Sequence, residues 1–140
     1  EPEPWLRARP AGPGWRPVVG PHSVYTVTPE RLRFAGELAA THGAVLHLHA
    51  AETAVEVEGC VAAHGRRPVE LLDDLGLLGP RTVLAHGVHL TDAEIDRLAG
   101  TGTTVVHCPA SNLKLASGVA RVPDLLAAGV ASARALRTSA

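Results

Sequence analysis

The sequence has few features of a secreted or membrane-spanning protein. Its two cysteines, Cys60 and Cys108, form no CxxC motif, so neither a disulfide framework nor a cysteine-based zinc site is predicted. It contains no apolar run of about 18 residues, the length that crosses a bilayer. The first residues are acidic and rich in proline, unlike a basic leader. We therefore expect a soluble chain that acts in the cytoplasm.

An excess of one charge is also missing. The 13 Lys and Arg residues nearly balance the 14 Asp and Glu residues, which leaves a formal net charge of -1. Such a chain has no long-range field to attract nucleic acid or an anionic membrane. We expect a small-molecule substrate as the partner, and neither nucleic acid nor a membrane.

Apolar runs and helix-like segments alternate along the chain. Prolines and glycines crowd residues 1–17 and predict a loop with no regular element. Thr followed three residues later by Glu, at Thr53 and again at Thr91, predicts helix starts with capping boxes. Strands are predicted at 18–19, 44–49, 82–85 and 103–107, with a fifth beginning at Val130, and helices at about 29–42, 53–64, 68–75, 91–100 and 123–128.

Strands separated by helices predict an α/β fold with a parallel sheet. A doubly wound sheet and part of a (β/α)8 barrel both fit, and the barrel is favoured because the strands end in polar, histidine-bearing loops. A complete barrel needs about 250 residues, so we expect a partial barrel covering about strands 4 to 7. The predicted division is a proline-rich arm at 1–15, the partial barrel at 16–130 and a tail at 131–140.

The segment 46–53, LHLHAAET, carries the most informative chemistry. His47 and His49 are two residues apart on one strand, so both point to the same face. His49 is nearer the strand end and is the predicted metal ligand, whereas His47 is expected to be a hydrogen-bonded interior residue. Glu52 is a candidate proton carrier, or an acidic group that favours the next helix start. His86 ends another apolar strand and is expected to face the same site.

Four motifs follow one another in the chain: GPHS at 20–23, HLHAAET at 47–53, AHGV at 85–88 and HCPASNLKL at 107–115. In this order they resemble the amidohydrolase superfamily, in particular the branch of the S-adenosylhomocysteine/5'-methylthioadenosine deaminases and triazine chlorohydrolases. The resemblance implies a metal-dependent (β/α)8 barrel that hydrolyses C–N bonds, or in some members C–Cl bonds, of nitrogen heterocycles.

The resemblance also implies roles for single residues. His49 would bind zinc or iron on the fifth barrel strand, and Glu52 would carry a proton between the attacking water and the ring nitrogen. His86, on the sixth strand, would orient or polarise that water. Substrate binding is implied for His22, after the fourth strand, and for Ser111, Asn112 and Lys114, in the loop after the seventh.

Two family features have no counterpart in this sequence. The first-strand H-x-H pair would lie upstream of Glu1, and residues 131–140 contain no acidic residue to match the metal-binding Asp of the eighth strand. We interpret these last residues as out-of-frame translation of GC-rich DNA. Because a catalytic zinc needs about three protein ligands, the isolated chain is expected to be an inactive fragment of a deaminase. The alternative is a non-catalytic remnant, or a half-barrel that self-associates through its open edges.

Overall fold

The computed structural model describes residues 3–8, 12 and 14–134. Within them a parallel sheet has the strand order β1-β2-β3-β4-β5, so that each strand pairs with the next one along the chain. A doubly wound sheet reverses its order at a switch point, whereas sequential order is that of a barrel. The predicted α/β class and partial (β/α)8 barrel are confirmed. The strands are Val18–Val19, Val45–Ala50, Thr82–His86, Thr104–His107 and Ser132–Arg134.

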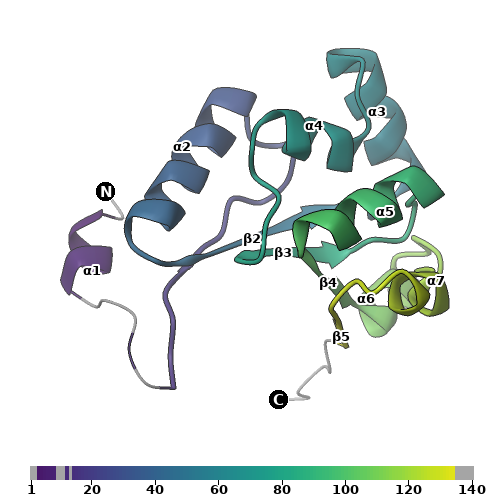
Figure 1. Ribbon diagram of the computed structural model, residues 1–140. Helices are drawn as coiled ribbons and strands as arrows, with labels where there is room; N and C mark the ends of the chain where they lie inside the picture. The colour runs from purple at the N-terminus through teal and green to yellow at the C-terminus, as the bar shows by residue number, and fades with distance from the viewer. Residues whose placement is uncertain (1–2, 9–11, 13, 135–140) are drawn as a thin grey trace.

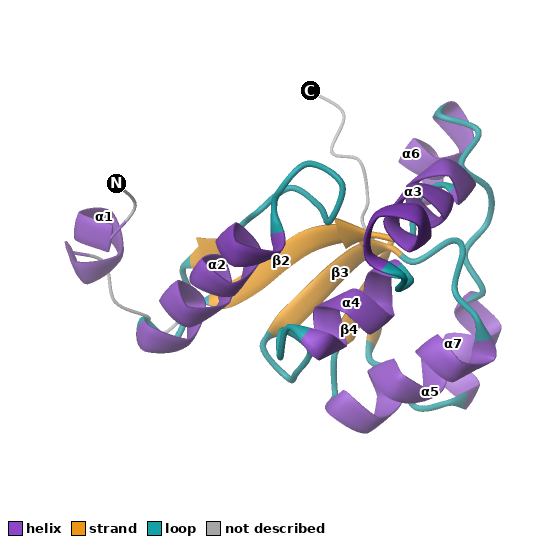
Figure 2. Cartoon of the chain, turned by 90° about the horizontal axis from the view of Figure 1, so that it is seen from above, coloured by secondary structure: helices purple, strands orange, loops and turns teal. Residues whose placement is uncertain are grey.

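Helices connect the strands and cover one face of the sheet. Figure 1 shows α2, α4 and α5 on the same side of the strands, and Figure 2 shows α2 and α4 in front of them from above. No helix among the described residues is long and apolar enough to cross a membrane. The helices after β1 are Pro29–Thr41 (α2), Ala54–His64 (α3), Pro68–Asp74 (α4), Asp92–Thr101 (α5), Pro109–Lys114 (α6) and Val122–Ala127 (α7).

The alternating burial of β2 separates a packing face from a chemical face. Leu46, Leu48 and Ala50 are at most 4% exposed and belong to one apolar cluster with leucines of α2 and α4. His47 and His49 lie between them in the sequence and remain partly exposed. Because neighbouring strand residues point to opposite faces, the helices cover the leucines and leave both histidines on the open face, and the predicted sharing of one face by His47 and His49 is confirmed.

Both predicted Thr caps are confirmed. The Thr53 hydroxyl accepts a hydrogen bond from the Glu56 amide at 3.1 Å, and the Thr91 hydroxyl accepts one from the Glu94 amide at 3.2 Å. Glu94 also accepts from the Thr91 amide, which completes the second capping box. The first box is incomplete, because the Glu56 carboxylate binds amides that precede Thr53.

The absence of regular structure predicted for residues 1–17 is wrong, because α1 spans Glu3–Ala8. Pro4 stands in the first turn, where a backbone N–H has no partner within the helix. Leu6 is 3% exposed and lines a cavity with residues of β1 and α2, so packing stabilises the short helix. Pro2, Pro10 and Pro13 lie outside the described residues.

The fifth strand begins at Ser132, two residues later than the predicted start at Val130. It pairs in parallel with β4, Ala133 beside Val106, and so lies within the segment 131–140 that we assigned to a tail. Residues 135–140 lie outside the described part of the chain. The division into arm, barrel and tail stays a prediction.

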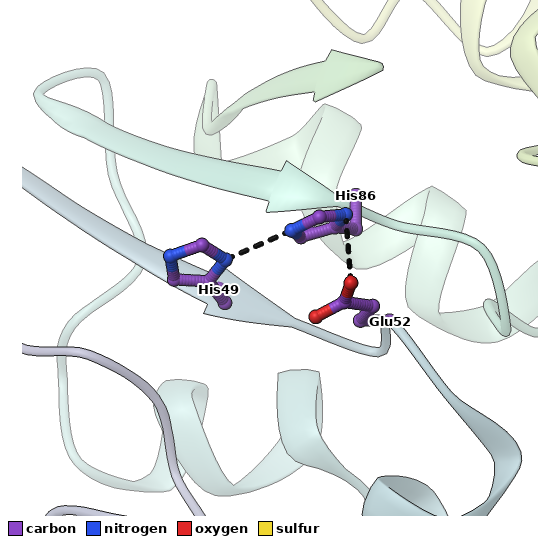
Figure 3. Close-up of side chains that lie close together, drawn as sticks. All are labelled: His49, Glu52 and His86. Carbon is purple, nitrogen blue, oxygen red and sulfur yellow. Dashed lines mark hydrogen bonds and ion pairs between the residues drawn. The ribbon is translucent and has the colours of Figure 1, made fainter. Parts of the chain in front are cut away.

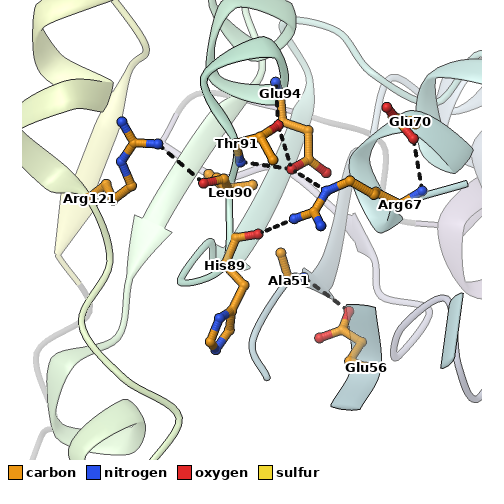
Figure 4. Close-up of polar contacts among 9 residues, drawn as sticks. All are labelled: Ala51, Glu56, Arg67, Glu70, His89, Leu90, Thr91, Glu94 and Arg121. Carbon is orange, nitrogen blue, oxygen red and sulfur yellow. Dashed lines mark hydrogen bonds and ion pairs between the residues drawn. The ribbon is translucent and has the colours of Figure 1, made fainter. Parts of the chain in front are cut away.

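A buried ion pair fastens the segment that links β3 to α5 (Figure 4). The Glu94 side chain is 1% exposed and accepts from the Arg67 Nε at 2.9 Å. Arg67 also donates to the carbonyl of His89 at 2.5 Å, and Arg121 donates to the carbonyl of the following residue at 3.3 Å. The start of α4 thus holds the loop that follows β3.

Replacing Arg67 with methionine is expected to lower the free energy of unfolding by about 2 kcal/mol, because the buried Glu94 carboxylate loses its cation. Urea denaturation measures this loss. R66M is the matched control: Arg66 pairs with Asp74 at the surface, both about half exposed, and its loss is expected to cost less than about 1 kcal/mol. Equal losses of unfolding free energy in R67M and R66M would contradict the stabilising role of the Arg67–Glu94 pair.

The two thiols are expected to differ in reactivity. Burial, followed by the charge of Glu56, raises the pKa of Cys60 to about 11. At pH 8 only about 0.1% of this thiol is then ionised, while Cys108 is partly exposed. An aromatic disulfide reagent should titrate Cys108 first and reach Cys60 only in denaturant. In the C108A variant only the slow phase should remain, which assigns that phase to Cys60. Equal reaction rates for the two thiols in the native protein would disprove the prediction.

Candidate active site

Three predicted site residues converge at the carboxyl ends of β2 and β3. His49 lies on β2, Glu52 lies in the loop that follows it, and His86 is the last residue of β3. The His49 Nδ1 and the His86 Nε2 are 2.8 Å apart, and the His86 Nδ1 is 3.5 Å from the Glu52 Oε1. Figure 3 shows the three side chains pointing toward one another. One ligand atom from each lies within 4.8 Å of the others, so the group has the dimensions of a metal site.

The backbone bends sharply where these side chains leave the strands. Ala51 has φ 52° and His86 has φ 77°, and both are non-glycine residues in the left-handed region. This conformation costs about 1 to 2 kcal/mol per residue, and strained residues of this kind cluster at functional sites. Gly87 follows with φ 55°, and a Cβ added there would meet Val105 at 2.9 Å, so glycine is required.

A chain of hydrogen bonds sets the state of the two imidazoles. The His86 Nδ1 lies 2.7 Å from the Oδ1 of Asn112, which is fully buried on α6. With this amide oxygen as acceptor, the His86 Nδ1 carries the proton and its Nε2 accepts from the His49 Nδ1. The His49 Nε2 then keeps its lone pair for a metal. Burial, followed by the neighbouring His86, lowers the pKa of His49, which favours this neutral form.

Two further histidines border this group. The His22 ring centroid lies 4.9 Å from that of His49, and its backbone carbonyl accepts from the His49 amide at 2.9 Å. The His22 ring itself is exposed and lies 2.8 Å from the Thr26 hydroxyl. The His47 centroid is 6.3 Å from that of His49, and burial lowers the pKa of His47. The hydrogen-bonded role of His47 stays a prediction.

A cavity of about 600 Å³ opens beside the histidines on the uncovered face. It is of the size that holds a small organic ligand. A second cavity, of about 610 Å³, lies at the other end of the strands and is lined by no histidine or cysteine. We therefore assign the candidate active site to the cavity beside the histidines. Its polar lining comes from His47, His49, His86, Cys108, Ser111 and Lys114.

The loop predicted after the seventh strand is wrong, because Ser111, Asn112 and Lys114 lie on the short helix α6. Pro109 occupies the first helical turn, a position typical of proline, and this signal could have indicated the helix. Ser111 and Lys114 line the cavity, whereas the Asn112 side chain is buried and bonds to His86. That bond was not predicted, since no sequence spacing connects residues so far apart.

Comparison with known proteins agrees with this geometry. The sequence model described as "Amidohydrolase family" matches residues 7–136. A 5-methylthioadenosine/S-adenosylhomocysteine deaminase of Nitratidesulfovibrio vulgaris (strain DP4) is 54% identical over 113 residues, which are 81% of this chain and 26% of the relative. An 8-oxoguanine deaminase of Pseudomonas aeruginosa is 49% identical over 112 residues, 80% of this chain and 25% of that protein.

A solved structure shows the same likeness. An adenosine deaminase from Xanthomonas campestris with bound zinc superposes with a TM-score of 0.80 at 44% identity, covering 82% of this chain and 26% of that one. The chain thus spans about a quarter of the length of the relatives it matches. From its sequence, its fold and its His-Glu-His group, the chain belongs to the amidohydrolase family.

Proposed function

We propose that this chain is part of a metal-dependent amidohydrolase that deaminates an aminopurine nucleoside or a related nitrogen heterocycle. The observation that carries the proposal is the convergence of His49, Glu52 and His86 at two neighbouring strand ends. The purine-directed names of the relatives support the substrate class. The cavity beside the histidines has room for such a ligand.

The donor atoms suit zinc or iron. Imidazole nitrogen and carboxylate oxygen are ligands that both metals accept, and the His49 Nε2 has the lone pair that coordination needs. We assign His49 as the ligand, and one ligand atom each of Glu52 and His86 lies within 4.8 Å of one of its ring nitrogens. Bound there, the metal would lower the pKa of a coordinated water toward neutrality.

Glu52 and His86 are the proposed catalytic pair. Deamination adds water to the ring carbon that carries the amino group, and the C–N bond breaks with its electrons on the departing nitrogen. Glu52 accepts a proton from the water and delivers it to the ring nitrogen, and the proton of the added hydroxyl then passes to the amino group, which leaves as ammonia while a carbonyl forms. The Glu52 side chain is 13% exposed, which keeps competing solvent away. His86, held by Asn112, orients the water, while His22, Ser111 and Lys114 are proposed to shape substrate binding.

Self-association is the second candidate. Val18 lies on the edge strand β1 and is 52% exposed, and the nearby Trp5 and Phe34 are 49% and 59% exposed. An exposed apolar edge strand pairs readily with another chain. The exposed edge of β1 therefore supports the proposal that this half-barrel associates with a second copy.

Deamination can be tested in a chimera. Residues 16–134 replace the matching segment of the Nitratidesulfovibrio relative, and ammonia release is measured with S-adenosylhomocysteine. The chimera should be active, and E52Q should lower kcat at least about 100-fold because the proton carrier is lost. E58Q, at an exposed position on α3, is the control. A zinc-bound chimera without activity, or an active E52Q variant, would refute the proposal.

Association can be followed by sedimentation velocity. The chain should show a sedimentation coefficient that rises with concentration, and V18K should reduce the rise because a lysine on an edge strand opposes pairing. V55K is the matched control, since Val55 is 77% exposed on α3, away from the edge. A monomer at every concentration would rule out this candidate.

A further inference from the structure

One buried carboxylate near the site has no part in the proposed chemistry. Glu56 lies in the first turn of α3 and is 5% exposed. Its Oε1 accepts from the Ala51 amide at 3.0 Å, and its Oε2 accepts from the Glu52 amide at 2.7 Å. A capping box would bring this carboxylate to the Thr53 amide. It binds instead the amide of Ala51, which follows β2, and the amide of Glu52, the proton carrier itself.

The turn that Glu56 binds is strained. Ala51 is fully buried with φ 52°, a conformation that L-residues avoid because the Cβ crowds the backbone. Successive amides in such a turn point the same way and form a concavity for an anion. Hydrogen bonds to an ionised acceptor are about twice as strong as neutral ones. The carboxylate thus stabilises a conformation that alanine alone disfavours.

The same turn supports the loop that begins at His86. The Ala51 carbonyl accepts from the amides of Val88 and His89 at 2.9 and 3.0 Å, and the Ala50 carbonyl accepts from the Gly87 amide at 3.1 Å. Figure 4 shows Glu56 reaching the Ala51 backbone on one side and Arg67 holding the His89 carbonyl on the other. A shift of Ala51 therefore moves both loops that carry catalytic side chains.

We propose that Glu56 is a positioning residue: by binding the amides of Ala51 and Glu52, it fixes Glu52 at 3.5 Å from His86. The inference rests on the proposed function only for the role of Glu52 as proton carrier. An acidic residue that merely favours the start of α3 would stabilise the helix without setting this distance.

Nuclear magnetic resonance of the labelled chain tests the proposal with E56Q and T53A. In E56Q an NH2 group replaces one carboxylate oxygen and cannot accept, so one amide loses its acceptor. We expect the exchange of the Ala51 and Glu52 amides to speed up at least about tenfold. The contacts between the Glu52 side chain and the His86 ring should weaken. T53A removes only the helix cap and should leave both readouts near wild type.

The opposite results overturn the proposal. It fails if E56Q leaves the two amides protected and the Glu52–His86 contacts intact, or if T53A changes them equally. Should E56Q not fold, E56Q/A51G replaces it, because glycine adopts a positive φ without strain. In that background the Glu52–His86 contacts should still be weaker than in A51G alone, and equal contacts would refute the role. Amide exchange and the Glu52–His86 contacts report the position of Glu52 and need no catalytic activity. A failure of this proposal is therefore distinguishable from a failure of the proposed deamination.

Discussion

The site depends on one constraint, the left-handed turn at Ala51. Its amide binds the Glu56 carboxylate and its carbonyl accepts two amides of the loop after β3. A buried backbone group without a partner is costly, and here both backbone groups of Ala51 have partners. The turn therefore ties α3, the Glu52 loop and the His86 loop into one unit. The Arg67–Glu94 pair extends the same unit to α4 and α5.

The chemistry of the site follows from how its imidazoles are held. The Asn112 Oδ1 lies 2.7 Å from the His86 Nδ1, the His86 Nε2 lies 2.8 Å from the His49 Nδ1, and the outer nitrogen of His49 takes no part in these contacts. A metal-ligating histidine is oriented by the partner of its other nitrogen in the same way. In this chain the partner is a second histidine whose other nitrogen also approaches Glu52. The donor set and the proton carrier are thereby parts of one hydrogen-bonded array.

The sequence was sufficient to predict features that depend on residues close together in the chain. The two-residue spacing of His47 and His49 predicted that both lie on one face of β2, and Thr53 and Thr91 predicted two helix starts, because a cap needs only residues within one turn. Local signals were insufficient where packing stabilises an element: α1 forms despite Pro4 because Leu6 is buried beside β1 and α2. The segment predicted as a loop after β4 is α6.

The α/β pattern, the family resemblance and the grouping of His49, Glu52 and His86 could all be inferred from the sequence. Strand ends of a parallel sheet meet at one edge, so residue types at these ends were sufficient. Two contacts required the folded chain to be seen: the Asn112 side chain bonds to the His86 Nδ1, and Glu56 holds the Glu52 turn. The first contact joins residues on separate elements. The second depends on a positive φ at Ala51. An alanine in a sequence does not indicate a positive φ, because L-residues rarely adopt it.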